Sequence, residues 1–530
     1  MGTAVDEPLR PRTASFLAPL VRYGLLRSDL DDGSQGTEPS QGAVLSVKRG
    51  AQRRRDPALA TVLAFAAVWI GVFGRLIYLR HARYATFDFD LGIHDQAIWL
   101  MTHEGHGFLT VRGMPALGHH TTFAYWLFAP FYWLGAGAQF INLVQVVSLA
   151  VPAVLLFLIG RDRMRSSWHA VPFAVAWLAH PSTQWLVWET FHPEVMAIVW
   201  IIAAYWFASN GRWRWYWVCV VIALCWKEDV GLAVMMLGVV MLFWRQRRRA
   251  IITIGLGAAW FVLMSMVLMP HITGHGTHAG TFYGELGESS SEVAINSLKH
   301  PDLVLERLDD NNALGYANRI NEPFGFTGAL SPLPLLIGLP QAMISMLSTA
   351  YFVIDPRYHY VAVPLTAAAL AMVEGVSRVR PRHIRTVLGC LIIVTALMAS
   401  RTNGISPIGR HYDEGFWPRP SARNAVLDTA IDVLGDRDGV AATWNLVPHL
   451  THRKHIYTYP NPWRVLNWGI AGEDPHPTTN VDWLILDLTK VGPDDRAIYD
   501  DLIRSGAFVL DFDRDEVIVA HRVGDTDAAP

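Results

Sequence analysis

Long apolar runs alternate with short polar or basic segments along the chain, a pattern typical of membrane-spanning helices. The first run extends from about Pro57 to Leu79 and follows Arg53, Arg54 and Arg55. At about 1.5 Å per residue, such a run crosses a hydrocarbon core of roughly 30 Å. Because basic residues favour the cytoplasmic side, the N-terminus is predicted to lie inside and the residues that follow the run outside.

Further apolar runs predict further spans, at about 138–160, 168–187, 195–208, 251–269, 361–376 and 386–400. Residues 213–244 are interrupted by Lys227-Glu228-Asp229 and are basic at both ends, so we expect two short helices that meet at these three residues. The proline-broken run from Leu330 is likewise divided into two short spans. The total is about eleven spans, with the N-terminus inside and the C-terminus outside.

Two apolar pieces fit this count only as non-spanning segments. Residues 123–134 are short and aromatic, and a crossing there would put the arginines at 161–165 outside. We therefore expect an interfacial or re-entrant piece. Residues 93–110 show an amphipathic spacing that predicts a helix lying in the membrane interface.

The ends of the chain differ from this apolar middle. Residues 1–55 predict a disordered cytoplasmic tail with a short amphipathic piece at 16–26, and they lack the apolar region of a signal peptide. Residues 56–402 form the predicted transmembrane domain, with external loops at 81–137 and 270–325. Residues 403–530 predict an extracytoplasmic α/β domain, with strands near 439–444, 455–459, 481–488 and 508–512 and helices at 422–434 and 495–505.

Composition agrees with a mainly α-helical, polytopic membrane protein. Hydrophobic residues make up 52% of the chain and charged residues 17%, and the mean hydropathy is +0.23. A net charge of −2 gives no basic excess, so nucleic acid is not an expected partner. Cys219, Cys225 and Cys390 all lie in apolar runs and predict small buried side chains rather than a disulfide or metal framework.

Candidate chemistry begins directly after the first span, with Asp88, Asp90, His94, Asp95 and Gln96. Two residues apart, Asp88 and Asp90 share a face in an extended segment but not in a helix. A solvated loop is one interpretation, and a general base or cation ligand is the other. The apolar neighbours of Asp90 favour a partly desolvated carboxylate, which a base near neutral pH requires.

Later polar groups are predicted to reach the same face. Glu189, His192 and Glu194 are either a polar cap between two spans or a second acid/base group and acceptor clamp. Three ionisable residues at 227–229 are costly in an apolar run unless they are paired or hydrated, so they form a structural ion pair or bind a leaving phosphate. Arg357 and His359 add candidate positive charge.

Neither a metal site nor a cofactor is predicted. His271, His275 and His278 have metal-like spacing, but the glycines and threonines around them are typical of a flexible loop. His103 and His106 have a two-residue gap where the zinc-protease motif has three. Trp463 and Trp468 are either interface residues or platforms for sugar stacking.

Five motifs together resemble a known family. They are Phe89-Asp-Leu-Gly-Ile-His-Asp-Gln96, His192-Pro-Glu194, Lys227-Glu-Asp229, Tyr358-His-Tyr360 and Pro448 to Tyr457. The chain resembles a bacterial family of polytopic membrane proteins of unknown function, which in turn resembles the GT-C glycosyltransferase superfamily. That resemblance implies polyprenyl-phosphate sugar donors and a catalytic carboxylate in the first external loop.

Carried to this sequence, the resemblance makes Asp90 the candidate base, with Asp88 as the alternate, and assigns the donor phosphate to Lys227, Arg357 and His359. His119-His120-Thr-Thr stands where protein mannosyltransferases have His-Pro-Pro-Leu. Glu194 is a further catalytic candidate. The remaining substrate-binding candidates are Asp95, Gln96, His119, His120, Glu189, His192, Glu228 and Asp229.

The predicted function is inverting, metal-independent sugar transfer at the outer face of the inner (plasma) membrane. The expected partners are membrane lipid, a polyprenyl-phosphate sugar and an envelope glycan, lipid or protein acceptor. A transporter or lipid flippase with a central site at residues 227–229 is an alternative hypothesis. A non-catalytic envelope scaffold is another.

Overall fold

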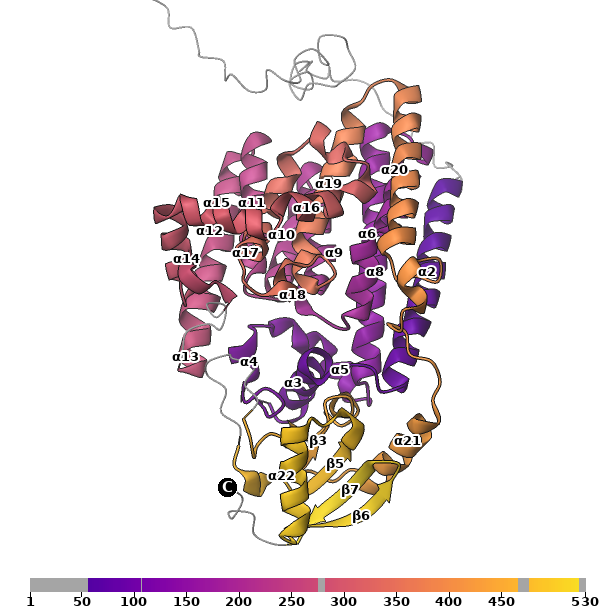
Figure 1. Ribbon diagram of the computed structural model, residues 1–530. Coiled ribbons are helices and arrows are strands. Elements are labelled where there is room, and N and C mark those ends of the chain that lie inside the picture. Colours follow the sequence, from indigo (N-terminus) through magenta and orange to yellow (C-terminus); the bar gives the residue numbers. More distant parts are fainter. Residues whose placement is uncertain (1–55, 106, 275–281, 466–475, 524–530) are drawn as a thin grey trace, which may run out of the picture.

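The computed structural model describes residues 56–105, 107–274, 282–465 and 476–523. Figure 1 shows a bundle of helices with a small sheet at one end, and α3 to α5 lie between the two. The predicted tail at 1–55, with its amphipathic piece at 16–26, lies outside the described residues.

Five described helices are long and apolar enough to cross a membrane. The first, α2 (Pro57–Ala82), begins where the Asp56 side chain accepts hydrogen bonds from the backbone N–H groups of Ala58 and Leu59. In its 18-residue apolar window only 28% of residues are buried, against 89% in Tyr351–Arg378, so α2 is peripheral and Tyr351–Arg378 is central. The others are α6 (Ala138–Met164), Arg247–Thr273 and α20 (Arg382–Asn403).

Two of these five are composite. Arg247–Thr273 joins α12 (Arg247–Phe261), a π-helical stretch and α13 (Met269–Thr273), and Tyr351–Arg378 joins α18 (Tyr351–Ile354) to α19 (Ala362–Arg378). Shorter helices pack among the long ones, namely α7 (Val171–Ala179), α8 (Pro181–Trp188), α9 (Pro193–Ser209), α10 (Trp213–Leu224), α11 (Val230–Phe243) and α17 (Leu339–Met346).

Two predictions about the shorter helices have different outcomes. The expected pair of short helices around Lys227-Glu228-Asp229 is confirmed by α10 and α11. A continuous helix over 168–187 is wrong, because the chain breaks at His180, whose ring accepts a hydrogen bond from the Ser182 N–H. Pro181 has no N–H to continue the preceding helix and begins α8 instead.

Predicted loops and surface pieces also contain helices. Within the expected loop at 270–325 lie α14 (Ser290–Lys299), α15 (Pro301–Asp310) and α16 (Ala313–Asn321), capped by Ser289 and Asn312 at the first and last. The interfacial helix expected over 93–110 is wrong. Instead α3 (Ile93–His103) ends early and is buried, including Asp95 and Gln96. Residues 123–132 form two helices of six and four residues, too short to cross a bilayer.

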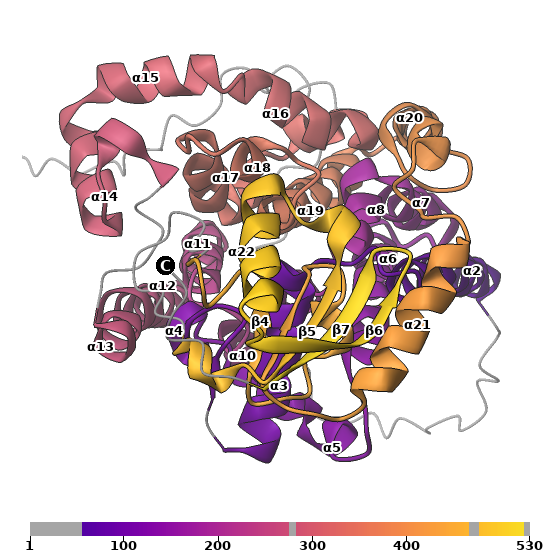
Figure 2. The same cartoon turned by 60° about the horizontal axis from the view of Figure 1, so that its bottom comes forward.

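The sheet near the C-terminus has the strand order β4-β3-β5-β7-β6 and is mixed. The first three strands of that order are parallel, and β5, β7 and β6 are antiparallel. Helices α21 (Ala422–Leu434) and α22 (Pro493–Arg504) lie beside the sheet (Figure 2). The strands are β3 (Val440–Ala442), β4 (Ile456–Thr458), β5 (Trp483–Asp487), β6 (Phe508–Arg514) and β7 (Val517–Arg522), of which β7 was not predicted.

Alternate residues of the strands belong to two separate cores. Ile485 and Val519 join the large core that extends into the helical bundle. Leu484 and Ile518 join a smaller core that contains Leu502 of α22. This two-residue period fixes which face of the sheet meets the bundle.

Candidate active site

The acidic segment after α2 is helical rather than extended. Residues 88–92 form one π-helical turn that leads into α3, so Asp88 and Asp90 point in different directions. The buried Asp88 carboxylate accepts a hydrogen bond from the Thr458 hydroxyl at 2.6 Å. Asp90 keeps a side-chain exposure of 28% and has its Oδ1 atom 3.4 Å from His192 Nε2.

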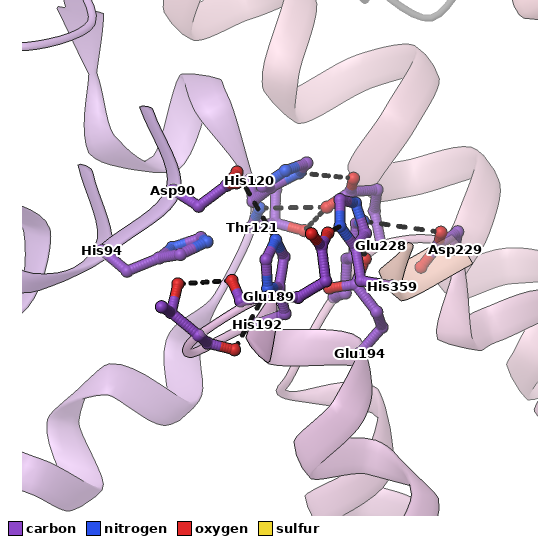
Figure 3. Close-up of polar contacts among 12 residues, drawn as sticks. Asp90, His94, His120, Thr121, Glu189, His192, Glu194, Glu228, Asp229 and His359 are labelled. Atoms are coloured by element: carbon purple, nitrogen blue, oxygen red, sulfur yellow. Dashed lines mark hydrogen bonds and ion pairs between the residues drawn. The ribbon is translucent and has the colours of Figure 1, made fainter. Parts of the chain in front are cut away.

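A continuous series of contacts leads from Asp90 to Lys227. Figure 3 labels Asp90, Glu189, His192, Glu194 and His359 along it. The His192 ring stacks on His359, with 3.9 Å between centroids. Nδ1 of His359 lies 3.3 Å from Glu189 Oε2, and its Nε2 lies 3.5 Å from Glu194 Oε1. Lys227 Nζ donates to the same Glu194 oxygen at 2.7 Å. We call these residues the ionisable cluster: Asp90, Glu189, His192, Glu194, Lys227 and His359.

The loop between α8 and α9 positions three of these residues, and a glutamine of α6 holds that loop. Gln145 donates to the Leu186 carbonyl at 2.6 Å and to the Thr190 carbonyl. Its Oε1 accepts the His192 backbone N–H at 2.6 Å. Thr190 has a φ of +70°, a conformation that costs about 1 kcal/mol or more outside glycine and is held by these bonds. Gln145 was not predicted, because nothing in an apolar run shows which loop it will contact.

A second group lies around the turn between α10 and α11. His120 Nδ1 and Glu228 Oε1 are 2.9 Å apart, and the Thr121 backbone N–H donates to Glu228 Oε2 at 3.2 Å. Lys227 Nζ also lies 3.9 Å from Asp229. The 118–121 stretch and the 227–229 turn are therefore held together by their polar groups.

Burial and mutual charge shift the pKa values in the loops of the site. Burial raises the pKa of Glu189 above its ordinary value. For His192, burial lowers the pKa, but the carboxylates of Asp90, Glu194 and Glu189 outweigh it and raise the pKa to about 9. Burial likewise lowers the pKa of Lys227, and the carboxylate of Glu194 raises it well above its usual range. Near neutral pH, the site therefore holds positive charge on His192 and Lys227.

Other predicted site residues point away from this cluster. Asp95 accepts hydrogen bonds from the Tyr132 hydroxyl at 2.5 Å and from the Thr451 hydroxyl. Gln96 bonds Thr110 at 2.9 Å and the Arg453 carbonyl at 3.3 Å. Both residues therefore connect α3 to the chain around the sheet.

Arg357 and His119 lie at the margin of the site. Arg357 is half-exposed and makes a two-pronged contact with Asp355, at 2.9 and 2.7 Å. The buried His119 ring lies 4.3 Å from that of His120. His94, which had no predicted role, has its Nδ1 2.5 Å from the Tyr125 hydroxyl. Its ring centroid lies 6.2 Å from that of His119 and 6.5 Å from that of His120.

Several weaker sequence signals carry no site here. His271 is exposed on α13, and His275, His278, His106 and Trp468 lie outside the described residues. Trp463 packs against Tyr459 and Phe508, at centroid distances of 6.1 and 6.0 Å. Of the cysteines, Cys219 is buried as predicted, Cys225 is half-buried and Cys390 is exposed on α20.

A different histidine set has the geometry of a ligand group. One potential ligand atom each from Glu189, His192 and His359 lies within 4.8 Å of the others. This ligand set was not predicted, because Glu189 and His192 are close in sequence but His359 comes from a distant part of the chain.

A cavity of about 450 Å³ lies between the helical bundle and the sheet. Basic and aromatic side chains are prominent in its wall, which also contains Glu414 and the Asp487 that is paired with Arg423. The other basic residues could attract an anion that carries a flat or apolar portion. The basic and aromatic residues include Arg80, Arg83, Arg423, Lys490, Trp188 and Trp444. Phe87 also lines this cavity, three residues before Asp90.

Comparisons with known proteins agree with this architecture. A family model described as "Predicted membrane protein (DUF2079)" matches residues 80–519. ArnT from Cupriavidus metallidurans bound to undecaprenyl phosphate is similar with a TM-score of 0.53 and 13% identity, over 89% of this chain and 100% of that chain. ArnT in the apo state gives 0.52 and 14%, over 88% and 99%. No curated protein matches the chain. At these identities the similarity shows the fold alone.

Proposed function

The chain belongs to the DUF2079 family of predicted membrane proteins, and on this premise we propose that it is a membrane glycosyltransferase of the GT-C type. It transfers a sugar from a polyprenyl-phosphate donor to an envelope glycan, lipid or protein acceptor. The ArnT-like fold supports this proposal, and one matched ArnT structure contains undecaprenyl phosphate, a polyprenyl phosphate.

The proposed topology follows the charge pattern of the sequence. About eleven spans cross the inner (plasma) membrane, with the N-terminus in the cytoplasm. Residues 403–530 and the ionisable cluster then lie on the outer side, where lipid-linked sugars and envelope acceptors meet.

The position of Asp90 is the observation that supports the proposal most strongly. Asp90 follows the first long helix, keeps a side-chain exposure of 28%, and lies 3.4 Å from the buried His192 ring. A carboxylate that is open to substrate on one side and held beside a histidine ring on the other is both accessible and oriented. A general base that accepts a proton from a hydroxyl needs both properties.

In the proposed reaction, Asp90 takes the proton of the acceptor hydroxyl as its oxygen attacks the anomeric carbon. The bond between that carbon and the phosphate oxygen breaks, and its electron pair remains on the departing polyprenyl phosphate. Inversion at the anomeric carbon follows from this single displacement.

Positive charge stabilises the departing phosphate. Lys227 is already bound by Glu194 in a buried ion pair. Its positive charge therefore attracts the phosphate from a distance rather than by direct contact. Arg357 is half-exposed and can exchange Asp355 for a phosphate at lower cost. The basic cavity beside Phe87 offers a second route for an anionic substrate to approach the acidic segment.

Sugar transfer from labelled polyprenyl-phosphate sugars to envelope glycans tests the proposal. Asp90→Asn keeps the shape of the side chain but removes the base, so we expect a loss of transfer of about 100-fold or more. Asp162→Asn makes the same exchange on an exposed residue near the C-terminal end of α6. It serves as the control and leaves transfer unchanged. Undiminished transfer in Asp90→Asn removes the assigned role, and no transfer by the parent protein from any donor tested removes the activity.

A further inference from the structure

The ionisable cluster contains more acidic groups than fixed positive charge. Asp90, Glu189 and Glu194 all face the His192 and His359 rings. Within the described part of the chain, Lys227 is the one lysine or arginine that forms an ion pair with any of these three carboxylates. The carboxylates of Glu189 and Glu194 are buried, and a cation bound beside them is attracted by their charge.

Two buried polar atoms in the cluster lack hydrogen bonds. Nε2 of His192 and Oε2 of Glu194 find no hydrogen-bond partner among the residues that the structure describes. Both residues are almost fully buried, at 3% and 4% exposure. Asp90 Oδ1 lies 3.4 Å from the His192 atom without the alignment of a hydrogen bond. Orphaned atoms of this kind in native proteins indicate an ion, a water molecule or a ligand.

The surroundings of His192 favour a metal over a water molecule. Its Nδ1 lies 3.3 Å from the Thr190 carbonyl, which holds a proton on Nδ1 and leaves Nε2 as the ring nitrogen that faces the cluster. A ligating histidine commonly has its second nitrogen held in this way. Gln145 in turn holds both Thr190 and the His192 backbone, so the ligand is oriented in advance.

From this geometry we infer that Glu189, His192 and His359 bind a divalent transition-metal ion. Their potential ligand atoms lie within 4.8 Å of one another. Because the His192 and His359 rings are stacked, one of the two rings must rotate for both to direct a nitrogen at one ion. Two imidazoles and one carboxylate favour Zn²⁺ over the hard ions Mg²⁺ and Ca²⁺, which prefer oxygen ligands. Asp90 and Glu194 border the open coordination position.

The inference goes beyond the proposed function, since the ion binds whether or not a sugar is transferred. Metal content and sugar transfer are therefore separate readouts.

Metal content of the purified full-length protein in detergent tests the inference. After removal of metal with a chelator and exposure to Zn²⁺ alone, we expect one tightly bound ion per chain. His192→Ala and His359→Ala each weaken Zn²⁺ binding by roughly 100-fold or more, because each removes a ligand. His271→Ala removes an exposed histidine of α13 and leaves the affinity unchanged. Retention of tight binding in both cluster variants overturns the inference, as does an equal loss in His271→Ala.

If a variant of a buried histidine fails to fold, a second test uses the unchanged protein. Co²⁺ bound by two imidazoles and a carboxylate gives the intense visible absorption of four- or five-coordinate cobalt. Absence of Zn²⁺ uptake, or the weak spectrum of an octahedral oxygen site, contradicts the inference. Neither measurement depends on sugar transfer, so failure of the metal site and failure of the proposed activity are distinguishable.

Discussion

Asp90 and Asp95 belong to the same short acidic segment, yet they contact two different regions of the molecule. Asp90 faces the ionisable cluster and remains partly exposed. Asp95 is buried between the Tyr132 and Thr451 hydroxyls, and Asp88 is buried against Thr458. The Asp90 side of the segment thus meets the ionisable cluster, in which carboxylates outnumber lysine. The Asp88 and Asp95 side forms hydrogen bonds that connect the segment to the chain around the sheet, and we call this contact the joint: Asp88, Asp95, Tyr132, Thr451 and Thr458.

The difference teaches that carboxylate density in a sequence is a poor guide to catalytic use. At the joint, each carboxylate accepts a hydrogen bond from at least one hydroxyl, and Asp95 also lies 3.4 Å from His452 Nε2. Gly92 lies so close that an added Cβ would be 3.2 Å from Val447. In the cluster, carboxylates share charged partners and orphaned atoms remain. Satisfied groups stabilise a fold, whereas unsatisfied ones are available to substrate or metal.

Lys227→Met is expected to have the largest effect on stability. It leaves Glu194 buried without its partner, which costs about 3–5 kcal/mol in the free energy of unfolding. Thermal and denaturant unfolding in detergent measure the loss, with the exposed Lys299→Met as the matched control. The double variant Lys227→Met with Glu194→Gln recovers part of it. Equal stability of the two lysine variants would show that the buried pair of Lys227 and Glu194 does not stabilise the fold.

Asp88→Asn is expected to change the pH dependence of stability. Burial raises the pKa of Asp88 from 3.8 to about 6. Between these two pH values, the folded state holds a proton on Asp88 that the unfolded chain has released. This contribution favours folding below about pH 4 and is lost as the pH rises through 6, a change of about 3 kcal/mol.

Unfolding of Asp88→Asn and of the parent at several pH values measures that contribution as a difference. The asparagine has no proton to lose, so the variant gains stability relative to the parent as the pH rises. A constant difference between about pH 4 and pH 7 would mean that Asp88 is not held in a dry joint.

Asp95→Asn is expected to weaken the joint by about 1.5–3 kcal/mol, because a charged acceptor of two hydroxyl hydrogen bonds becomes a neutral amide. Faster hydrogen exchange around residues 447–458 accompanies the loss. Asp413→Asn, an exposed residue with a long contact to Arg419, stays within about 0.5 kcal/mol of the parent. Unchanged exchange in Asp95→Asn argues against a structural role for this carboxylate.

Arg357→Gln is expected to have the smallest effect on stability, below about 1 kcal/mol, since its ion pair with Asp355 is half-exposed. Its effect on sugar transfer is larger and concerns the apparent KM for the donor, because the residue is proposed to bind phosphate. A loss of several kcal/mol would place Arg357 with the structural residues instead.

Periodicity predicts much of this fold. Long apolar runs identify the five long helices, and the break at 227–229 identifies α10 and α11. The break at His180 depends on one proline in an otherwise apolar run, and helices α14 to α16 depend on short caps, so both were missed. Strand β7 pairs with β6 in a hairpin whose two-residue turn is Asp515 and Glu516, and it was missed because this pair is not the Asn-Gly or Asp-Gly typical of such turns.

The candidate site was predicted in composition but not in arrangement. Motif residues at 90, 189–194, 227 and 359 do meet, because their polar side chains all lie at helix ends or breaks. Asp95, Gln96 and Arg357 could not be separated from them by sequence, since their partners come from residues hundreds of positions away or from an exposed turn. Gln145 and the metal-like geometry of Glu189, His192 and His359 likewise depend on tertiary contacts.

Sugar transfer by Asp90→Asn and Asp95→Asn, each normalised to folded protein, tests the central claim most directly. The account predicts that Asp90→Asn melts like the parent and loses transfer by about 100-fold or more, whereas Asp95→Asn melts at a lower temperature and retains transfer in its folded fraction. Full transfer by folded Asp90→Asn, or its loss in folded Asp95→Asn alone, would contradict the account.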